Sequence, residues 1–468
     1  MMRLPKLCVF ISAWAFAALR VCCCDAQGLD YWIALDRETD LPSLAVTLRY
    51  AGGPAGADRL TLPARFTGDR QSLRDFRLRV RGGAWRYTPD SMAIDIAYPP
   101  GDTVTLSYRV AAHQPFLTTG ITLTPSLFVA PGFAFLAAPQ WEQYRPRIRF
   151  AESDYRAVLP DAHYPDLRWL ETLCTGGGAY RYVQRGLLEL WIAGDEWPFA
   201  DTELLEMLYM ADQAQQQLWR VSTPTPLSLA LTPLPPPPVM AQGGTAATLG
   251  PSGIQLGDGL SCFAHPQSLS GAGDLEHLLH HETTHRYIGG NIREGADAGS
   301  RHWAWLTEGF TEYMALQSRI VAGSLRPKEY AALLNDAYLR PYYLSPLANV
   351  ENTRIAAHYA EPAYAEIAYL RGCILAFYLD MRMQKRNGMR LADVMTATAR
   401  AFGEQGKSLE RDFDFFSKKI SAALGTDFAP IYQKHILRGE PIRDFVTPAG
   451  MSLRFESDGV PVLSIREE

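Results

Sequence analysis

The chain has 468 residues, of which 47% are hydrophobic and 20% charged, and its formal net charge at pH 7 is −5. At the usual size of a domain, this length corresponds to about two to four domains. The composition excludes wholesale disorder, collagen and coiled coil. The mild negative charge also lacks the basic footprint that phosphate backbones require, so no nucleic acid partner is expected.

The N-terminal segment has the pattern of a secretion signal. Arg3 and Lys6 precede an uncharged apolar run over residues 7–19, which is too short to cross a bilayer as a helix. No later stretch reaches the ~18 consecutive apolar residues of a membrane helix. We therefore expect cleavage near Gln27 and export to the periplasm or the extracellular space, without stable membrane insertion. A lipid anchor on Cys22 is the alternative.

The remaining sequence predicts an α+β, multidomain protein. Short alternating segments separated by Gly, Pro and Asp turns fill residues 27–145 and are typical of a β-sandwich-like domain. From about residue 271, helical periodicity dominates, and the last residues have the pattern of one or two strands. The expected parts are a signal peptide over 1–26, a β-rich domain over 27–145, a mixed domain over 146–322, a helical domain over 323–445 and a β tail over 446–468. The main helices are expected over 202–219, 274–288, 304–322, 327–337, 364–386 and 391–401, with further helical segments over 409–437.

Three cysteines, Cys174, Cys262 and Cys373, follow the expected cleavage site. They allow one disulfide at most, and they are too few and too far apart for a thiolate zinc site. We expect buried or singly paired thiols, with the pairing left open.

The sequence His281-Glu-Thr-Thr-His285 lies on one of the expected helices. Residues four apart share a helix face about 6 Å apart, so the two imidazoles can bind one tetrahedral zinc ion while Glu282 faces the water that it would deprotonate. A zinc hydrolase also needs a third ligand and an open fourth position, and Glu308 on the next helix is placed to supply that ligand. Glu312, one turn later, can accept the remaining N–H of a ligand histidine. We therefore expect one Zn²⁺ per chain.

The surrounding segments resemble a known family. The run Trp-Leu-Thr-Glu-Gly-Phe-Thr-Glu-Tyr over 305–313, whose Glu308 follows His285 after 22 intervening residues, is similar to the Glu-Gly-Phe segment of gluzincin metallopeptidases. The aminopeptidase N and leukotriene hydrolase group has 18 residues there, whereas the glycyl aminopeptidase family has a longer insertion, as this chain does. The chain most resembles that family along most of its length. The resemblance implies a thermolysin-like fold over 146–322, zinc, and hydrolysis of a peptide or protein substrate.

A second segment, Tyr-Ala-Glu-Ile-Ala-Tyr-Leu-Arg-Gly from Tyr364 to Gly372, is similar to the Tyr-x-Lys-Gly segment of these enzymes. The resemblance gives Tyr369 the role of a hydrogen-bond donor to the tetrahedral oxyanion, which is typically worth a few kcal/mol. A packing tyrosine is the alternative. Arg371 stands where the family has lysine. Tyr364 and His302 are further candidates for contact with substrate.

One expected feature of exopeptidases is missing. In this superfamily a Gly-x-Met-Glu-Asn or Gly-Gly-Leu-Glu-His strand supplies the glutamate that holds the substrate's free amine. The corresponding stretch here is predicted over 257–262, Gly-Asp-Gly-Leu-Ser-Cys, with Ser261 at the glutamate position. Asp258 is a candidate replacement, although an aspartate between glycines is commonly a turn residue. For His277 and His280, on the same helix as the motif, we expect a structural or solvent-exposed role.

The sequence thus favours an exported zinc metallopeptidase, aminopeptidase-like, in which Glu282 and Tyr369 are catalytic. Three alternatives remain at this point: a catalytically silent zinc- and peptide-binding homologue, an endopeptidase, and a non-peptide hydrolase on the same fold. Side-chain preference and oligomeric state stay open.

Overall fold

A computed structural model describes most of the chain. The chain folds into two compact units, Met1–Gly178 and Ala179–Glu468. The division lies within the domain expected over 146–322, whose first part belongs to the first unit. The signal peptide expected over 1–26 lies outside the described residues. These are 27–36, 43–61, 77–88, 93–111, 122–123, 126–141, 143–152, 155–158, 167, 170, 173–221, 223–234, 252–256, 259–294, 301–446 and 450–465. Within these ranges, no helix combines the length and hydropathy needed to cross a bilayer.

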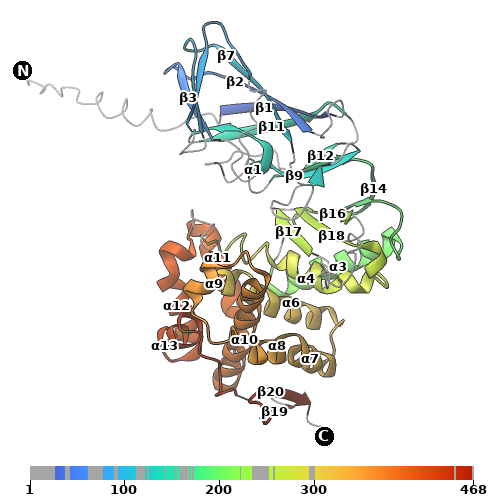
Figure 1. Ribbon diagram of the computed structural model, residues 1–468, viewed down its shortest axis with the longest axis vertical. Helices are drawn as coiled ribbons and strands as arrows, with labels where there is room; N and C mark the ends of the chain where they lie inside the picture. Colours follow the sequence, from blue (N-terminus) through green and yellow to red (C-terminus); the bar gives the residue numbers. More distant parts are fainter. Residues whose placement is uncertain are drawn as a thin grey trace, which may run out of the picture. The chain divides into compact units, whose positions relative to one another are not determined.

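The first unit consists of three sheets that share one hydrophobic core, and it is drawn in blue to teal in Figure 1. The sheet orders are β11-β1-β2-β7-β4, β10-β3-β6-β5 and β12-β13-β9-β8. The elements are β1 (Gln27–Asp36), β2 (Ser43–Ala51), β3 (Ala57–Thr61), β4 (Arg77–Arg79), β5 (Ala84–Thr88), β6 (Ala93–Ala97), β7 (Thr103–Ala111), β8 (Thr122–Leu123), β9 (Leu127–Pro131), α1 (Gly132–Phe135), β10 (Ala138–Pro139), β11 (Tyr144–Phe150), β12 (Arg156–Val158) and β13 (Cys174–Gly178).

Alternating hydrophobicity explains these sheets, because every second side chain of a strand points into the core. In β1, Leu29, Tyr31 and Ile33 are buried, while the residues between them face outward. Buried tyrosines also need partners for their hydroxyls. The hydroxyl of Tyr31 donates to the carbonyl of Ala137 at 2.9 Å and so ties this segment to the core.

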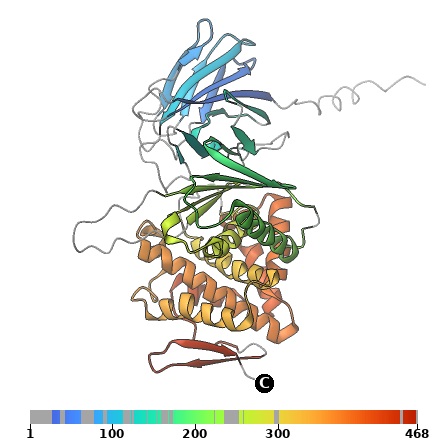
Figure 2. The same ribbon diagram turned by 90° about the vertical axis from the view of Figure 1, so that its right-hand side faces the viewer.

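The second unit begins with a five-stranded mixed sheet of order β14-β15-β16-β18-β17. Helices α3 and α4 lie on one face of this sheet, as Figure 2 shows, and α6 packs against both of them. Leucines from the sheet and the helices form the core between these layers. The elements are β14 (Tyr180–Arg185), β15 (Leu188–Ala193), α3 (Asp201–Leu218), β16 (Leu227–Pro233), β17 (Ser252–Leu256), β18 (Gly259–Ala264), η4 (Pro266–Ser268), η5 (Ala272–Leu275), α4 (Glu276–Thr284), α5 (Ala304–Thr307) and α6 (Gly309–Ala322).

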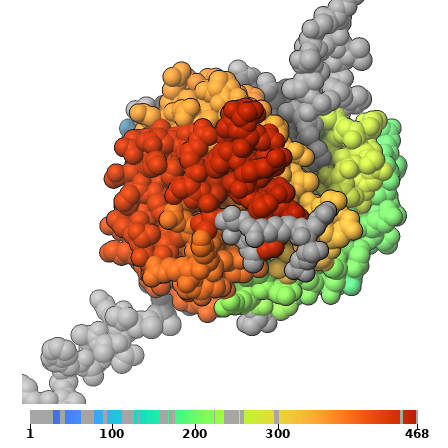
Figure 3. Space-filling model, turned by 90° about the horizontal axis from the view of Figure 1, so that it is seen from below, coloured from blue at the N-terminus to red at the C-terminus, as the bar shows by residue number. Residues whose placement is uncertain are grey.

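The rest of the second unit is helical and ends in a two-stranded hairpin. Helix α10 packs against α5, α6 and α12, and Figure 3 shows this end of the unit with the C-terminal segments in red. Arg371 of α10 is buried and donates to the carbonyls of Val350 and Ile436, so it ties together two connecting segments. The elements are α7 (Pro327–Leu333), η6 (Leu334–Leu339), α8 (Arg340–Leu344), α9 (Asn352–Ala357), α10 (Pro362–Asn387), α11 (Leu391–Gln405), α12 (Leu409–Leu424), α13 (Ala429–Ile431), η7 (Tyr432–Leu437), β19 (Met451–Phe455) and β20 (Pro461–Ile465).

The cysteines have no disulfide within the described side chains. Cys262 and Cys373 are both free and buried, and burial raises the pKa of each thiol well above its ordinary value. The side chain of Cys174 lies outside the description.

Candidate metal centre

Helix α4 carries His281 and has His285 as its C-cap, and a buried glutamine fixes the helix in place. The side-chain amide of Gln215, on α3, donates to the carbonyl of His280 at 2.9 Å and to the hydroxyl oxygen of Thr284 at 2.7 Å. The indole N–H of Trp219 donates in turn to Gln215 Oε1 at 2.8 Å. The helix is shorter than expected, because it ends at Thr284 and the chain then turns through Gly289.

Three side chains that the sequence singled out converge at one point. His281 Nε2 lies 3.0 Å from His285 Nε2, and Glu308 Oε2 lies 3.5 Å and 3.4 Å from these two nitrogens. In the described part of the chain, these residues are the one group of three whose ligand atoms lie close enough together to hold a metal ion. Zinc bonds of about 2.0–2.1 Å in a tetrahedron separate the ligand atoms by about 3.3 Å. The observed distances match that spacing.

The other ring nitrogens show which atoms face the centre. His285 Nδ1 lies 3.1 Å from the carbonyl oxygen of Ile288, which can only accept a hydrogen bond. His281 Nδ1 lies 2.9 Å from Glu312 Oε1, an ion-pair contact that is not aligned as a hydrogen bond. Both contacts favour a proton on Nδ1 and leave the Nε2 lone pairs facing each other and the carboxylate of Glu308. A cation between these three groups would stabilise the arrangement, so the residues fit zinc.

The charges of the cluster shift its pKa values strongly. Burial alone would lower the pKa of His281, but the Glu312 and Glu308 carboxylates raise it well above its ordinary value. Burial would likewise lower the pKa of His285, but the Glu308 carboxylate raises it. Burial would raise the pKa of the carboxylates of Glu308 and Glu312. The neighbouring histidines instead hold both pKa values well below the ordinary value of a glutamate. The protein groups alone therefore form a tightly coupled charged cluster.

Glu282 lies beside this cluster with an oxygen that is free to accept a proton. Its side chain is buried, and Oε2 has no hydrogen-bond partner within the described residues. Burial raises the pKa of Glu282, although the neighbouring histidines oppose the increase. A Cβ atom on Gly253 would lie 2.8 Å from the Glu282 carboxylate, so the glycine lets β17 approach this side chain. A carboxylate in this position can act as a general base.

The strand that approaches Glu282 at Gly253 is β17, whereas Ser261 lies on the neighbouring strand. Ser261 lies on β18, an inner strand between β16 and β17, whereas β17 is the edge strand and contains Gly253. The five residues of β17, Ser-Gly-Ile-Gln-Leu, include no carboxylate that could hold a substrate amine. Asp258, in the connection between the two strands, lies outside the described residues.

A close crossing of two helices brings Tyr369 to the cluster. A Cβ on Gly309 would clash with the backbone of Gly372, so both glycines are needed for α6 and α10 to cross. Tyr369 stands one turn before Gly372, and its ring stacks on His281 with 6.0 Å between the ring centroids. Burial and the Glu308 carboxylate raise the pKa of Tyr369 well above its ordinary value. Tyr369 is therefore a neutral hydrogen-bond donor beside the cluster.

The other sequence candidates differ in their surroundings. Tyr364 is buried and stacks on His358, with 5.0 Å between the centroids, and His302 is exposed. Burial lowers the pKa of His280 to about 3, and its Nδ1 lies 2.8 Å from the Ser318 hydroxyl, which is a structural role. Tyr359, which is hydrogen-bonded to Tyr369, was not among the candidates from the sequence, because it lies just outside the segment from Tyr364 to Gly372.

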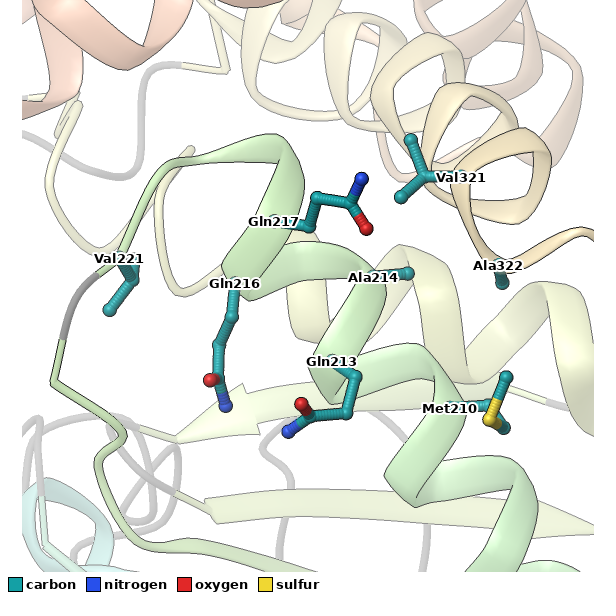
Figure 4. Close-up of a pocket in the computed structure, with 8 residues that line it drawn as sticks. All are labelled: Met210, Gln213, Ala214, Gln216, Gln217, Val221, Val321 and Ala322. Atoms are coloured by element: carbon teal, nitrogen blue, oxygen red, sulfur yellow. The ribbon is translucent and has the colours of Figure 1, made fainter.

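A pocket of about 300 Å³ lies between α3 and the end of α6, and Figure 4 shows its lining. The residues that line it are Met210, Gln213, Ala214, Gln216, Gln217, Val221, Val321 and Ala322. None of them can serve as a nucleophile, a general base or a strong metal ligand. This pocket therefore does not compete with the cluster as a catalytic site.

Comparison with known proteins supports the fold. No family model and no curated protein matches the chain. The chain is similar to the crystal structure of an aminopeptidase N family protein from Idiomarina loihiensis, with a TM-score of 0.67 and 14% sequence identity over 89% of this chain and 77% of that chain. At this identity the likeness shows the fold alone. It confirms a mixed α and β, aminopeptidase-like fold, whereas the glycyl aminopeptidase family and the separate domains stay predictions.

Proposed function

We propose that the protein is a zinc-dependent metallopeptidase of the gluzincin type. The observation that carries the proposal is the convergence of the two Nε2 atoms of His281 and His285 with Glu308, beside a carboxylate oxygen of Glu282 that has no partner among the described residues. His281, His285 and Glu308 would hold one zinc ion. Zinc, when bound, supplies a Lewis acid that lowers the pKa of water toward neutrality and polarises the scissile carbonyl.

The protein's own groups would carry the protons and steady the charge. Glu282 takes a proton from the attacking water and passes it to the leaving amine, a contribution of roughly 10²–10⁴-fold. The hydroxyl of Tyr369 donates a hydrogen bond to the oxyanion that forms on the carbonyl oxygen. The aminopeptidase-like fold supports a peptide as the substrate, as does the resemblance of the motifs.

A second candidate function is endopeptidase activity, and β17 favours it. This strand approaches Glu282 at Gly253, yet it contains no acidic residue. A free amino terminus therefore gains no ion pair from the five residues of β17, and along this strand an internal peptide bond is not disfavoured. We retain aminopeptidase-like cleavage as the first candidate, and the substrate test below decides between them.

The test compares the wild type with Glu282→Gln. We expect one zinc per chain in both proteins and cleavage of a mixed peptide library by the wild type alone, because glutamine keeps the shape of the side chain but cannot accept the proton. Glu276→Gln is the matched control, since Glu276 lies on the same helix and pairs with Arg319 at 2.7 Å. It should keep full activity. Peptides with free and blocked amino termini then distinguish the two candidates.

Three other results would change the proposal. A Glu282→Gln protein that keeps most of the wild-type activity would remove Glu282 from the mechanism. Zinc without cleavage by either protein would leave a zinc- and peptide-binding protein or a non-peptide hydrolase. A wild type that binds no zinc would remove the site itself. Export through the expected signal peptide is a separate proposal, and sequencing of the mature amino terminus tests it.

A further inference from the structure

A buried carboxylate links the proposed zinc site to two residues that have no assigned role in it. Glu312 of α6 divides its oxygens between two sides. Oε1 lies 2.9 Å from His281 Nδ1, whereas Oε2 lies 2.8 Å from His277 Nε2 and accepts a hydrogen bond from the hydroxyl of Tyr338. The Tyr338 hydroxyl also lies 3.3 Å from His277 Nε2, so the imidazole and the hydroxyl meet at the same carboxylate oxygen.

The backbone places these groups from three separate elements. His277 stands one helical turn before His281 on α4, so the same face of the helix presents both rings to Glu312. Tyr338 belongs to η6, a π-helical segment that ends with a hydrogen bond from the N–H of Arg340 to the carbonyl of Asn335. A π-turn contains one residue more than an α-turn and is often found at functional sites. The extra residue rotates the side chains that follow it around the helix axis. In this protein the π-turn contains Tyr338, whose hydroxyl reaches Glu312.

The contacts of His277 also indicate how it acts. Its Nδ1 is buried and has no hydrogen-bond partner in the described ranges, while its Nε2 faces the carboxylate. An N–H on Nε2 can donate to Glu312 Oε2, whereas a proton on Nδ1 would have no acceptor among the described residues. Because His277 and Tyr338 both meet Oε2, the other oxygen, Oε1, is left to His281.

We infer that His277 and Tyr338 are positioning residues for the zinc ion, acting through Glu312. Together they hold Oε2, so that Oε1 stays against His281 and keeps that imidazole with its Nε2 lone pair toward the metal. Partners that orient a ligand histidine typically change metal affinity by about 10–100-fold. Because His277 and Tyr338 act one step further out, we expect the lower end of this range, about tenfold for each. The inference rests on the zinc-dependent function proposed above.

The experiment measures the dissociation constant of zinc by competition with a chelator, starting from the zinc-loaded full-length protein. His277→Leu and Tyr338→Phe each remove one donor to Glu312, and we expect each to raise the constant about tenfold. His277→Gln keeps an N–H that can reach the same oxygen, so it should bind zinc nearly as the wild type does. Tyr330→Phe is the matched control, because Tyr330 is a buried tyrosine on the preceding helix, α7, and has no described contact with Glu312.

Two accompanying measurements separate positioning from folding. The melting temperature of the metal-free proteins shows whether a variant is simply less stable, and the absorption spectrum of the cobalt-substituted proteins reports the geometry of the ligands. We expect His277→Leu and Tyr338→Phe to alter the cobalt spectrum, and Tyr330→Phe to leave it unchanged. Zinc affinities within about twofold of the wild type for both donor variants would overturn the inference and leave the proposed function intact. A wild type that binds no zinc would instead overturn the proposed function, and this inference with it.

Discussion

Two groups of buried charged residues in the second unit are satisfied in opposite ways. Asp380 of α10 is 1% exposed and accepts three hydrogen bonds, from the hydroxyl of Tyr313 at 2.6 Å, the amide of Gln384 at 2.7 Å and the backbone N–H of Leu391 at 2.5 Å. In the proposed zinc cluster, by contrast, two imidazole nitrogens and a carboxylate oxygen converge on one point, 3.0–3.5 Å from one another.

The difference separates a structural network from a functional one. Buried polar groups in proteins are almost always paired, because an unpaired group costs about 1–3 kcal/mol. The network of Asp380 is complete within the protein, so its contribution is to stability. In the cluster of His281, His285 and Glu308, the side-chain atoms instead converge in the way that a bound cation would require. The two groups therefore differ in what their neighbours provide, which is hydrogen-bond donors around Asp380 and other possible metal ligands around Glu308.

Removal of zinc should have the largest effect and acts on the cluster alone. We expect chelation to abolish peptide hydrolysis and, where free zinc was 1,000 times its dissociation constant, to lower the free energy of unfolding by roughly 4 kcal/mol. Thermal melting with and without chelator measures this change. A Glu308→Gln protein, which lacks the third ligand, should melt at the same temperature under both conditions. A wild-type melting temperature that does not change on removal of zinc would contradict the proposal that the cluster binds the ion.

Two conservative substitutions of tyrosine should separate activity from stability. Tyr369→Phe should lower kcat by about 10²–10³-fold, equivalent to about 2.7–4 kcal/mol, because it removes a donor to the oxyanion. Its melting temperature should hardly change. Tyr313→Phe removes a donor to Asp380 and should lower the stability by about 1–3 kcal/mol while sparing kcat. Steady-state kinetics and thermal melting of both proteins measure these effects. A loss of stability in Tyr369→Phe together with a loss of kcat in Tyr313→Phe would contradict the assigned roles.

Asp380→Asn tests the structural network directly. Asparagine has nearly the same shape, but its NH2 group is a donor and would face either the N–H of Leu391 at Oδ1 or the Tyr313 and Gln384 donors at Oδ2. We expect the free energy of unfolding to fall by about 2–3 kcal/mol, without a change in zinc affinity. Asp393→Asn is the control on α11, where the carboxylate lies near the surface and pairs with Arg220. Denaturant unfolding should show a much smaller effect for the control than for Asp380→Asn.

The local part of the cluster was accessible from the sequence because one helix dictates it. Two histidines four residues apart on a helix share a face, and Glu308 stands in a recognisable Glu-Gly-Phe segment that begins the helix packed against α4. The ends of several helices were also accessible, such as that of α10, which terminates at Gly388 in a left-handed conformation. These features depend on neighbours in the sequence.

Contacts across the fold could not be obtained in this way. Tyr338 reaches Glu312 from a π-turn, which leaves no mark on hydrophobic periodicity. The order of the strands in the sheet was also not accessible, since hydrophobic alternation does not say which strand is the outer one. The structure places Ser261 on the inner strand β18 and Gly253 on the edge strand β17. Such features depend on packing between segments distant in sequence.

An exposed ion pair completes the comparison and should have the smallest effect. Glu329, whose side chain is 44% exposed at the start of α7, accepts hydrogen bonds from the guanidinium of Arg326 and from its backbone N–H at 2.9 Å, and these lower the pKa of Glu329 from 4.5 to about 2. A lowered carboxyl pKa adds stability above pH 4.5, and this contribution disappears as the pH falls toward 2. Glu329→Gln should therefore melt slightly below the wild type at pH 7, with a difference that shrinks below pH 4.5. A loss of stability as large as that of Asp380→Asn, or one that does not change with pH, would contradict this expectation. It would show that solvent does not weaken the pair of Arg326 and Glu329, and that burial does not explain the difference between this pair and Asp380.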